Sequence, residues 1–310
     1  MIYITGATGH IGNNLARQLD KENIPFKILA RRITEAIIPY KDRVIIGDIF
    51  NMDFLAANLQ EKDTLVHLAA YINLKNNQSS LTEEINYHGV VKIVDFCIKN
   101  DIYLVFSSSV DCLKGDEYCL REPENISFNQ ENLYQRTKAQ ATEYLIEKMH
   151  ANLIDAFIVY PSAVIGINDY KPSAVGKEIR NCFKRRIWFY FSGGYNFVDV
   201  EDVVIAITNG LKSRIKGQFI IGGNYVDLKT MYQLIFKNLN RRVLLIKIPN
   251  FVIKLISKII PKFKVMIEAL LFKHNFSNKK MKTILNVQPK PVEETIKNTV
   301  EWFRANKKKS

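Results

Sequence analysis

The stretch MIYITGATGHIGNNLARQLDK, residues 1–21, decides the fold of this chain. An apolar run, MIYIT, leads directly into the glycine-rich turn TGATGHIG, and an amphipathic segment follows from about Gly12 to Glu22. This order of strand, glycine turn and helix is typical of a dinucleotide site, because the helix points its positive end at the phosphates. An ordinary strand–helix turn is the alternative, but the predicted context favours the dinucleotide site.

Three glycines, Gly6, Gly9 and Gly12, define this turn with the spacing G-x-x-G-x-x-G. The spacing differs from the common G-x-G-x-x-G fingerprint. We expect Gly6 to allow the tight turn, Gly9 to let backbone N–H groups approach a pyrophosphate, and Gly12 to let the helix pack closely on the strand.

Further along the chain, short apolar runs alternate with amphipathic stretches. The runs are FKILA, RVIIGD, TLVHLAA, YLVFSSS and LIDAFIVYP, with helices expected near 81–99 and 132–150. Continuous apolar runs separated by helices predict a parallel sheet buried on both faces, so the fold class is α/β with a doubly wound Rossmann sheet. We assign residues 1–165 to this domain and 166–310 mainly to a smaller C-terminal substrate-binding lobe. Segments near 196–222 are expected to return to the Rossmann domain.

The composition of the 310 residues, with 47% hydrophobic and 24% charged, predicts a globular protein and excludes disordered, collagen-like and disulfide-scaffold classes. The four cysteines and five histidines show no ligand-like spacing, so we expect no metal site, no disulfides and a cytoplasmic location. The N-terminus runs straight into a strand, which predicts no signal peptide. Lysines interrupt the most apolar tract, residues 249–276, so it lacks the pattern of a membrane span.

The net charge of +13 lies entirely in the last 70 residues, which hold 17 basic and 4 acidic side chains. Within them, Lys254, Lys258 and Lys262 recur every four residues, the pattern of a basic amphipathic helix that Pro261 divides in two. Such a helix either lies on an anionic membrane surface or packs its apolar side in the substrate lobe, and the second reading is favoured. Nucleic acid is not predicted, because no recognition motif is present.

The choice between NADP and NAD depends on the end of the second strand, where Arg31 and Arg32 follow FKILA and no acidic residue stands. An acid there would bind the ribose 2′-hydroxyl of NAD, whereas arginine accommodates the 2′-phosphate of NADP. The pair favours NADP, with NAD the alternative if the two arginines only solvate the strand end. Asp48, at the end of RVIIGD, could accept from the adenine amino group or simply form a turn.

Candidate catalytic groups follow two later elements. Tyr134 and Lys138 lie four residues apart on one predicted helix face, and the ammonium is expected to lower the pKa of the tyrosine. Such a pair can move the proton that accompanies hydride transfer. The serines ending YLVFSSS place a hydroxyl at the carboxyl edge of the sheet, where α/β proteins bind ligands.

Five ordered motifs resemble the extended short-chain dehydrogenase/reductase superfamily, also called the NAD(P)-dependent epimerase/dehydratase superfamily. They are TGATGHIG at 5–12, HLAA at 67–70, SSS at 107–109, YQRTK at 134–138 and NFVDVEDVV at 196–204. The likeness covers nearly the whole chain and is greatest to the dihydroflavonol-4-reductase-like group. It implies a Rossmann fold and hydride transfer between NAD(P) and a carbonyl or alcohol carbon.

By this resemblance, Tyr134 is the catalytic acid–base, Lys138 lowers its pKa and bonds the nicotinamide ribose, and Ser109 polarises the substrate carbonyl. Asn86 matches a family asparagine behind the active site. The positions that match cofactor contacts are Gly6, Thr8, Gly9, His10, Ile11, Gly12, Asp48, Ile49, Ala69, Ala70, Tyr134, Lys138, Pro161 and Ala163.

Departures from the family pattern narrow the reaction. The loop after Ser109 reads VDCLKG instead of ending in Val-Tyr-Gly, and Tyr160 stands where sugar-nucleotide enzymes often have arginine. The Asp-Glu pair of the 4,6-dehydratases is replaced by Val110 and Asp111, which disfavours a dehydratase.

We therefore expect an NADP-dependent reductase of a small carbonyl compound, or a dehydrogenase of the matching alcohol. The basic lobe would attract an anionic substrate. The alternatives are an NAD-dependent nucleotide-sugar epimerase and a non-catalytic NADPH-binding sensor or scaffold. Relatives often form homodimers through the helix that carries Tyr134 and Lys138.

Overall fold

The structure, a computed structural model, describes residues 1–71, 80–113, 119–123, 126, 132–259, 267, 270–271 and 275–306, with the backbone alone for 256–259. Its centre is a parallel sheet with the strand order β11-β7-β5-β4-β1-β2-β3. The strands are β1 (Ile2–Thr5), β2 (Phe26–Ala30), β3 (Val44–Ile46), β4 (Thr64–His67), β5 (Tyr103–Ser107), β7 (Ala156–Pro161) and β11 (Gly217–Ile221). The order reverses between β1 and β4, so the predicted doubly wound α/β sheet is confirmed.

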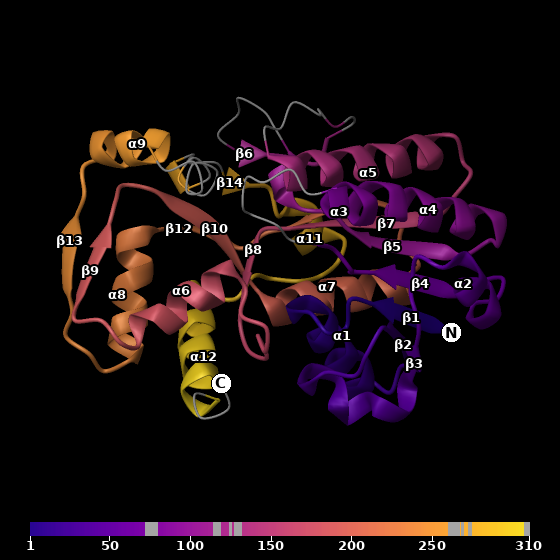
Figure 1. Cartoon of the computed structure of the whole chain (residues 1–310), viewed down its shortest axis with the longest axis horizontal. Coiled ribbons are helices and arrows are strands. Elements are labelled where there is room, and N and C mark those ends of the chain that lie inside the picture. Colours follow the sequence, from indigo (N-terminus) through magenta and orange to yellow (C-terminus); the bar gives the residue numbers. More distant parts are fainter. Residues whose placement is uncertain are drawn as a thin grey trace.

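Helices cover both faces of this sheet (Figure 1). One face carries α2 (Met52–Asn58), α4 (Gly89–Lys99) and α5 (Leu133–His150), and the other carries α1 (His10–Lys21), η1 (Glu35–Arg43) and α7 (Val200–Lys212). Every residue of β4, β5 and β7 is buried, which explains why these strands are continuously apolar in sequence. Short elements precede α4 and follow β5: α3 (Ser80–Glu83), η2 (Glu84–His88) and η3 (Val110–Cys112).

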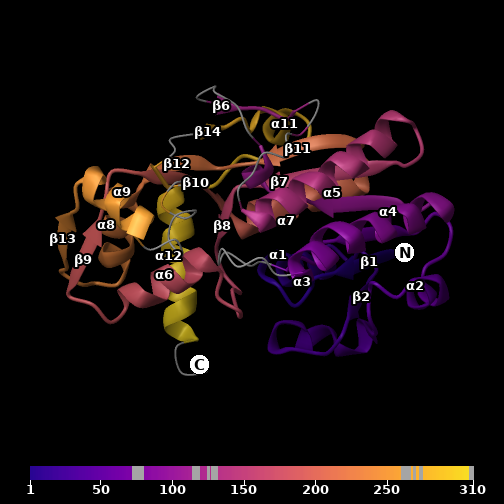
Figure 2. The ribbon, with the colours of Figure 1, turned by 45° about the horizontal axis from the view of Figure 1, so that its top comes forward.

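A second group of elements forms the lobe at the other end of the molecule (Figure 2). Its helices are α6 (Ala174–Cys182), α8 (Leu228–Asn238), α9 (Asn250–Ile259) and α12 (Val292–Ala305). Its strands are β8 (Ala163–Ile165), β9 (Ile187–Tyr190), β10 (Gly194–Asp199), β12 (Asn224–Asp227) and β13 (Leu244–Lys247). A separate apolar core joins these elements apart from α9, and within it the ring of Trp188 contacts those of Tyr232 and Phe236.

Segments near 196–222 divide between the two parts. Residues 217–221 join the main sheet as β11, and α7 packs against α1, as expected of a segment that returns. The run NFVDV does not enter the main sheet: β10 lies between β8 and β12 in a three-stranded sheet of its own. The division at residue 165 stays a prediction. Between the two parts lie β6 (Cys119–Leu120), β14 (Asn275–Phe276) and α11 (Lys279–Thr283).

Candidate active site

The glycine turn has no room for a side chain at Gly6 or Gly12, and more room at Gly9. Gly6 has φ +72°, and a Cβ there would lie 2.6 Å from the backbone of Leu68. A Cβ on Gly12 would lie 2.4 Å from the Gly6 carbonyl oxygen, whereas one on Gly9 would meet only that oxygen, at 3.2 Å. The turn therefore holds α1 against the sheet and leaves room over Gly9 for a pyrophosphate.

The first turn of α1 suits an anion. Gly9 is the N-cap and offers no side chain to the first N–H groups, and the first turn holds no acidic residue. Thr8 and Ile11 are half-buried beside it. Helix N-termini carry partial positive charge, so the residues present fit the phosphates of a dinucleotide.

His10 has a structural use in this turn. Its Nε2 lies 2.9 Å from the carbonyl oxygen of Ile167, and burial lowers its pKa, so the neutral ring donates to that carbonyl. The amides of Asn13 and Asn14 also bond to carbonyls of residues 167–168. The turn is thereby fastened to the segment that follows β8, a contact that sequence spacing could not predict.

The adenosine end of the expected site lies at the carboxyl ends of β2 and β3. Arg31 and Arg32 follow β2 directly, and both side chains are exposed. Asp48 follows β3 and accepts a hydrogen bond of 3.0 Å from the backbone N–H of Phe50, the geometry of a turn-forming aspartate. Ile49 packs into the core, so only its backbone remains available to a ligand.

The middle of the expected site follows strands near the topological switch. Ala69 and Ala70 are half-buried just after β4, and the N–H of Ala69 lies 3.4 Å from the Thr5 hydroxyl oxygen. Pro161 is the last residue of β7 and Ala163 the first of β8. These positions share the carboxyl edge of the sheet, the place where doubly wound folds bind ligands.

Asn86 holds the chain that follows β4 at this edge by bonding the backbone of Tyr71. It is buried in η2, a π-helical turn, where its side-chain oxygen accepts from the N–H of Tyr71 at 2.8 Å and its amide donates to the Tyr71 carbonyl at 2.9 Å. π-Helical turns are frequent at functional sites. The amide of Asn86 fixes the backbone that continues from Ala70.

The proposed acid–base pair comes from the first two turns of α5. Asn132 caps the helix by accepting from the N–H groups of Tyr134 and Gln135. Lys138 is buried: its Nζ donates to the Ser107 carbonyl oxygen at 2.7 Å and lies 4.7 Å from the centre of the Phe106 ring. Burial lowers the pKa of Lys138 to about 8.

The three serines after β5 have three different uses. The Ser107 backbone holds Lys138, and the Ser108 hydroxyl is buried against that of Thr142 at 2.7 Å. Ser109 is half-buried and caps η3, its hydroxyl oxygen accepting from the N–H of Asp111 at 3.2 Å. The short helix η3 packs against α5, and the Ser109 hydroxyl bonds to the backbone of η3, whereas that of Ser108 turns to Thr142 on α5.

The expected lowering of the tyrosine pKa is wrong for this structure. Tyr134 is buried, and burial, together with the nearby carboxylate of Asp111, raises its pKa above the ordinary value. Lys138 bonds a backbone carbonyl instead. Tyr134 is therefore protonated in this structure and can act as a proton donor, although its raised pKa makes it a weaker acid than an exposed tyrosine.

Asp111 and Tyr195 form a pair that sequence reasoning missed. The hydroxyl of Tyr195, on β10, donates to the carboxylate of Asp111 at 2.5 Å, and burial raises the pKa of Asp111. In the sequence, Asp111 showed only that a dehydratase motif is incomplete. Its partner lies 84 residues away on the lobe, and no local pattern predicts such a contact.

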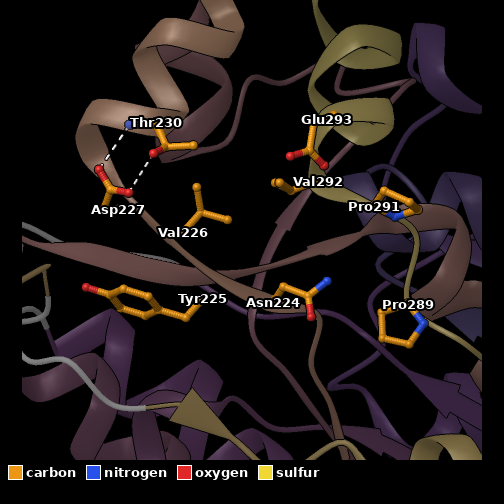
Figure 3. A pocket seen from close by; sticks show the side chains of 9 residues that line it. All are labelled: Asn224, Tyr225, Val226, Asp227, Thr230, Pro289, Pro291, Val292 and Glu293. Atoms are coloured by element: carbon orange, nitrogen blue, oxygen red, sulfur yellow. Dashed lines mark hydrogen bonds between the residues drawn. The ribbon is translucent and has the colours of Figure 1, made fainter.

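A surface pocket of about 490 Å³ lies elsewhere, between the start of α8 and the start of α12 (Figure 3). Asp227, which lines the pocket, caps α8 by accepting from the N–H and hydroxyl of Thr230. The pocket contains none of the predicted site residues. In the described part of the chain, no three His, Cys, Asp or Glu side chains are grouped to hold a metal ion.

Comparison with known proteins agrees with this geometry. A sequence model of the NAD dependent epimerase/dehydratase family matches residues 2–222. The chain belongs to this family. The family resemblance seen in the motifs is confirmed, and with it an NAD(P)-dependent superfamily of oxidoreductases, epimerases and dehydratases.

Two curated relatives in the family have different names. "Sterol demethylase protein B" of Methylococcus capsulatus is 25% identical over 236 residues, which cover 74% of this chain and 72% of the relative. "Putative dihydroflavonol 4-reductase" of Synechocystis sp. is 28% identical over 240 residues, 73% of this chain and 69% of the relative. The likeness to the dihydroflavonol-4-reductase-like group is thus confirmed.

The fold also matches a solved structure in the family. UDP-glucose 4-epimerase of Thermotoga maritima, solved with UDP-glucose, superposes with a TM-score of 0.80 at 18% identity, over 98% of this chain and 99% of that one. At this identity the match shows the fold alone. Within the described residues, every helix is too short or too polar to cross a membrane.

Proposed function

We propose that this protein is an NADP-dependent oxidoreductase that reduces a carbonyl group of a small molecule to an alcohol, or runs the reverse reaction. The observation that carries the proposal is that Tyr134 and Lys138 are buried on one helix, α5, whose Lys138 bonds the end of β5, the strand that Ser109 follows, at the sheet edge that also bears the glycine turn. A protonated tyrosine at this edge suits the reductive direction, because the alkoxide formed by hydride addition needs one proton.

The binding residues would divide the cofactor among them. Gly6, Gly9 and Gly12 would hold the pyrophosphate, and Arg31 and Arg32 would contact a 2′-phosphate. When bound, NADPH supplies the hydride that becomes the new C–H bond.

The chain's own groups would handle the oxygen and the proton. The Ser109 hydroxyl would donate a hydrogen bond to the carbonyl oxygen, and Tyr134 would transfer its phenolic proton to it. The ammonium of Lys138, which in this structure bonds the Ser107 carbonyl, would have to turn toward Tyr134 to stabilise the tyrosinate that remains. The names of the two relatives described above concern substrates other than nucleotide sugars, which favours a reductase, whereas a third relative bears the name of a nucleotide-sugar epimerase and keeps that alternative open.

Cofactor titration tests this proposal. We expect NADPH to bind at least tenfold more tightly than NADH, because two charge-assisted contacts to a phosphate contribute about 1.5–3 kcal/mol each. The double variant Arg31→Ala/Arg32→Ala should lose this preference. Lys27→Ala, which removes an exposed cation from the same strand, β2, is the matched control and should keep it.

The alternatives give different outcomes. A preference for NADH, or purification with firmly bound NAD, would replace the proposal by an epimerase that keeps its cofactor. Tight NADPH binding, with no NADPH oxidation across a panel of aldehydes, ketones and enones, would favour a sensor or scaffold.

A further inference from the structure

The outer end of the lobe carries an uncovered apolar sheet face. The two strands β9 and β13 form a parallel ribbon in which Ile187 pairs with Leu244 and Phe189 with Ile246. These four side chains are 49%, 60%, 55% and 36% exposed, respectively. Residues on the opposite side of the ribbon, such as Trp188, pack against α8. Among the residues that the structure describes, the lobe core therefore covers one face of this ribbon and leaves the other exposed.

The first turns of α9 extend this apolar surface. Phe251 and Leu255 lie one turn apart and are 74% and 57% exposed, while Ile253 between them is buried. The start of α9 is fixed to the ribbon, because the side chain of Asn250 makes two hydrogen bonds to the backbone of Ser192, at 3.0 and 3.1 Å. Figures 1 and 2 both show α9, β9 and β13 together at this end. We call the six exposed side chains, Ile187, Phe189, Leu244, Ile246, Phe251 and Leu255, the outer apolar face.

The two chain segments that form the outer apolar face carry charge of one sign. Residues 184–192 and 241–259 contain eight lysines and arginines and no aspartate or glutamate. Six of these basic side chains are exposed: Lys184, Arg185, Arg186, Arg242, Lys247 and Lys254. Lys258 belongs to α9 but its side chain is not described, and the expected break at Pro261 and the lysine at 262 lie outside the described residues.

This combination selects among possible partners. A second copy of the chain would set one basic rim against another if the same faces met, and like charges across an interface are unfavourable. Nucleic acid would satisfy the cations but leave six apolar side chains without partners. A bilayer with anionic lipids satisfies both, because apolar side chains enter the acyl boundary while lysine and arginine stay at the level of the phosphates.

We propose that the outer apolar face docks this protein on the surface of an anionic membrane. Phe251, Leu255 and the four ribbon residues would enter the interface, and the surrounding cations would pair with lipid phosphates. The protein would lie on the membrane without spanning it. The inference does not rest on the proposed reductase activity, since it uses none of the residues of that site.

Sedimentation of the full chain with lipid vesicles tests the proposal. We expect binding to phosphatidylcholine vesicles that contain phosphatidylglycerol at low salt, weaker binding at high salt, and little binding to phosphatidylcholine alone. The double variants Leu244→Ser/Phe251→Ser and Lys247→Glu/Lys254→Glu should each weaken binding at least tenfold.

Matched controls change the same residue types elsewhere on the surface. Ile38→Ser/Leu153→Ser removes two apolar side chains that are 56% and 52% exposed, and Lys27→Glu/Lys41→Glu reverses two exposed lysines. Both controls should bind vesicles within twofold of the wild type. Because every substituted side chain is exposed, all variants are expected to keep the wild-type melting temperature within a few degrees.

Insertion depth gives a second, direct measurement. Tryptophan fluorescence of Leu244→Trp should shift to shorter wavelength on anionic vesicles and be quenched by brominated acyl chains, whereas that of Leu153→Trp should not. Absence of vesicle binding at low salt, or equal binding by the outer-face variants and their controls, would overturn the proposal. It would also be overturned if Leu244→Ser/Phe251→Ser dissociated a wild-type dimer that does not bind vesicles, because the partner would then be a second copy.

Discussion

Strands β5 and β13 have similar sequences but opposite surroundings. Both are short parallel strands with consecutive apolar residues, YLVFS and LLIK. In β5 every residue is buried, because helices cover both faces of the main sheet. In β13 the alternate residues Leu244 and Ile246 are exposed, because α8 covers one face only. An apolar run therefore predicts a strand, but whether a second layer covers it depends on the rest of the fold.

The two regions also differ in what they do with polar groups. At the carboxyl edge of the main sheet, buried polar groups such as Lys138 are held by specific hydrogen bonds. A catalytic site needs such bonds, because its side chains must be held in a fixed position relative to the reacting atoms. At the outer end of the lobe, the charges are exposed and share one sign, which suits attraction to an extended surface. Four predictions, which use five substitutions and their controls, test this contrast.

The largest effect is expected at Tyr134. Replacing it by phenylalanine removes the proposed proton donor, so kcat for NADPH oxidation should fall by about 10²–10⁴-fold. NADPH affinity, measured by titration, should change little, because the glycine turn and the arginine pair are intact. Tyr144→Phe is the control: it lies on the same helix, and its hydroxyl bonds Asp95. Equal losses in both variants would contradict a catalytic role specific to Tyr134.

The second-largest effect is expected on the free energy of unfolding, which should depend on whether a strand is buried on both faces, as β5 is, or on one face, as β13 is. Leu104→Ala in β5 removes a fully buried side chain and is expected to lower the free energy of unfolding by about 2–5 kcal/mol. Leu244→Ala in β13 removes a side chain that is 60% exposed and should change it by no more than about 0.5 kcal/mol. Urea unfolding of the two variants measures the difference. Similar losses would mean that another layer covers β13 in solution.

The buried, charged side chain of Lys138 is expected to lower the free energy of unfolding of the protein. Its pKa is about 8 in the folded chain and has an ordinary value of 10.5, so the unfolded state binds more protons between about pH 8 and 10.5. The free energy of unfolding should therefore rise with pH across this window, and the charge should cost at most about 3 kcal/mol below it. The bond from Lys138 Nζ to Ser107 offsets part of this cost.

Lys138→Met is the variant that tests this cost. It should unfold with a free energy at least as large as the wild type at pH 7 and lack the rise above pH 8, in urea titrations without cofactor. Lys27→Met changes an exposed lysine and should keep the rise. If the free energy of unfolding of the wild type did not rise above pH 8 either, the lowered pKa of Lys138 would be contradicted.

The smallest effect is expected at Asp111. Asp111→Asn removes a carboxylate that raises the pKa of Tyr134, so that pKa should fall. Because a phenol of lower pKa donates its proton more readily, kcat for NADPH oxidation at pH 7 should rise by at most about tenfold, or about 1.4 kcal/mol. Asp95→Asn removes the equivalent partner of Tyr144, outside the site, and should leave kcat unchanged. A fall in kcat would contradict this action of Asp111 on the proton donor and indicate a purely structural role.

Much of the main sheet and its glycine turn could be predicted from the sequence. The runs MIYIT, FKILA and YLVFS form β1, β2 and β5, and the turn after β1 opens α1 as expected. The signals here are local: strand, turn and helix are adjacent along the chain. The expectation that the run NFVDV, residues 196–200, returns to the main sheet is wrong. A strand has the same local sequence pattern in a small sheet as in a large one.

The site could be predicted only where its residues carry motifs. Tyr134, Lys138 and Ser109 are placed on the expected elements, although their roles stay a proposal. The protonated state of Tyr134 could not be predicted, because burial depends on what packs around the helix. The contact between Asp111 and Tyr195 joins the two parts of the chain and has no trace in either segment.

The sequence by itself determined the parallel sheet, the dinucleotide turn and the family, since each follows from residues close together along the chain. It also located the excess positive charge in the last 70 residues. Only the tertiary structure decided which lysine is buried, what each of the three serines bonds, and which apolar faces stay exposed. Burial is a property of neighbours in space, and Ile187 meets Leu244 only after the chain has folded.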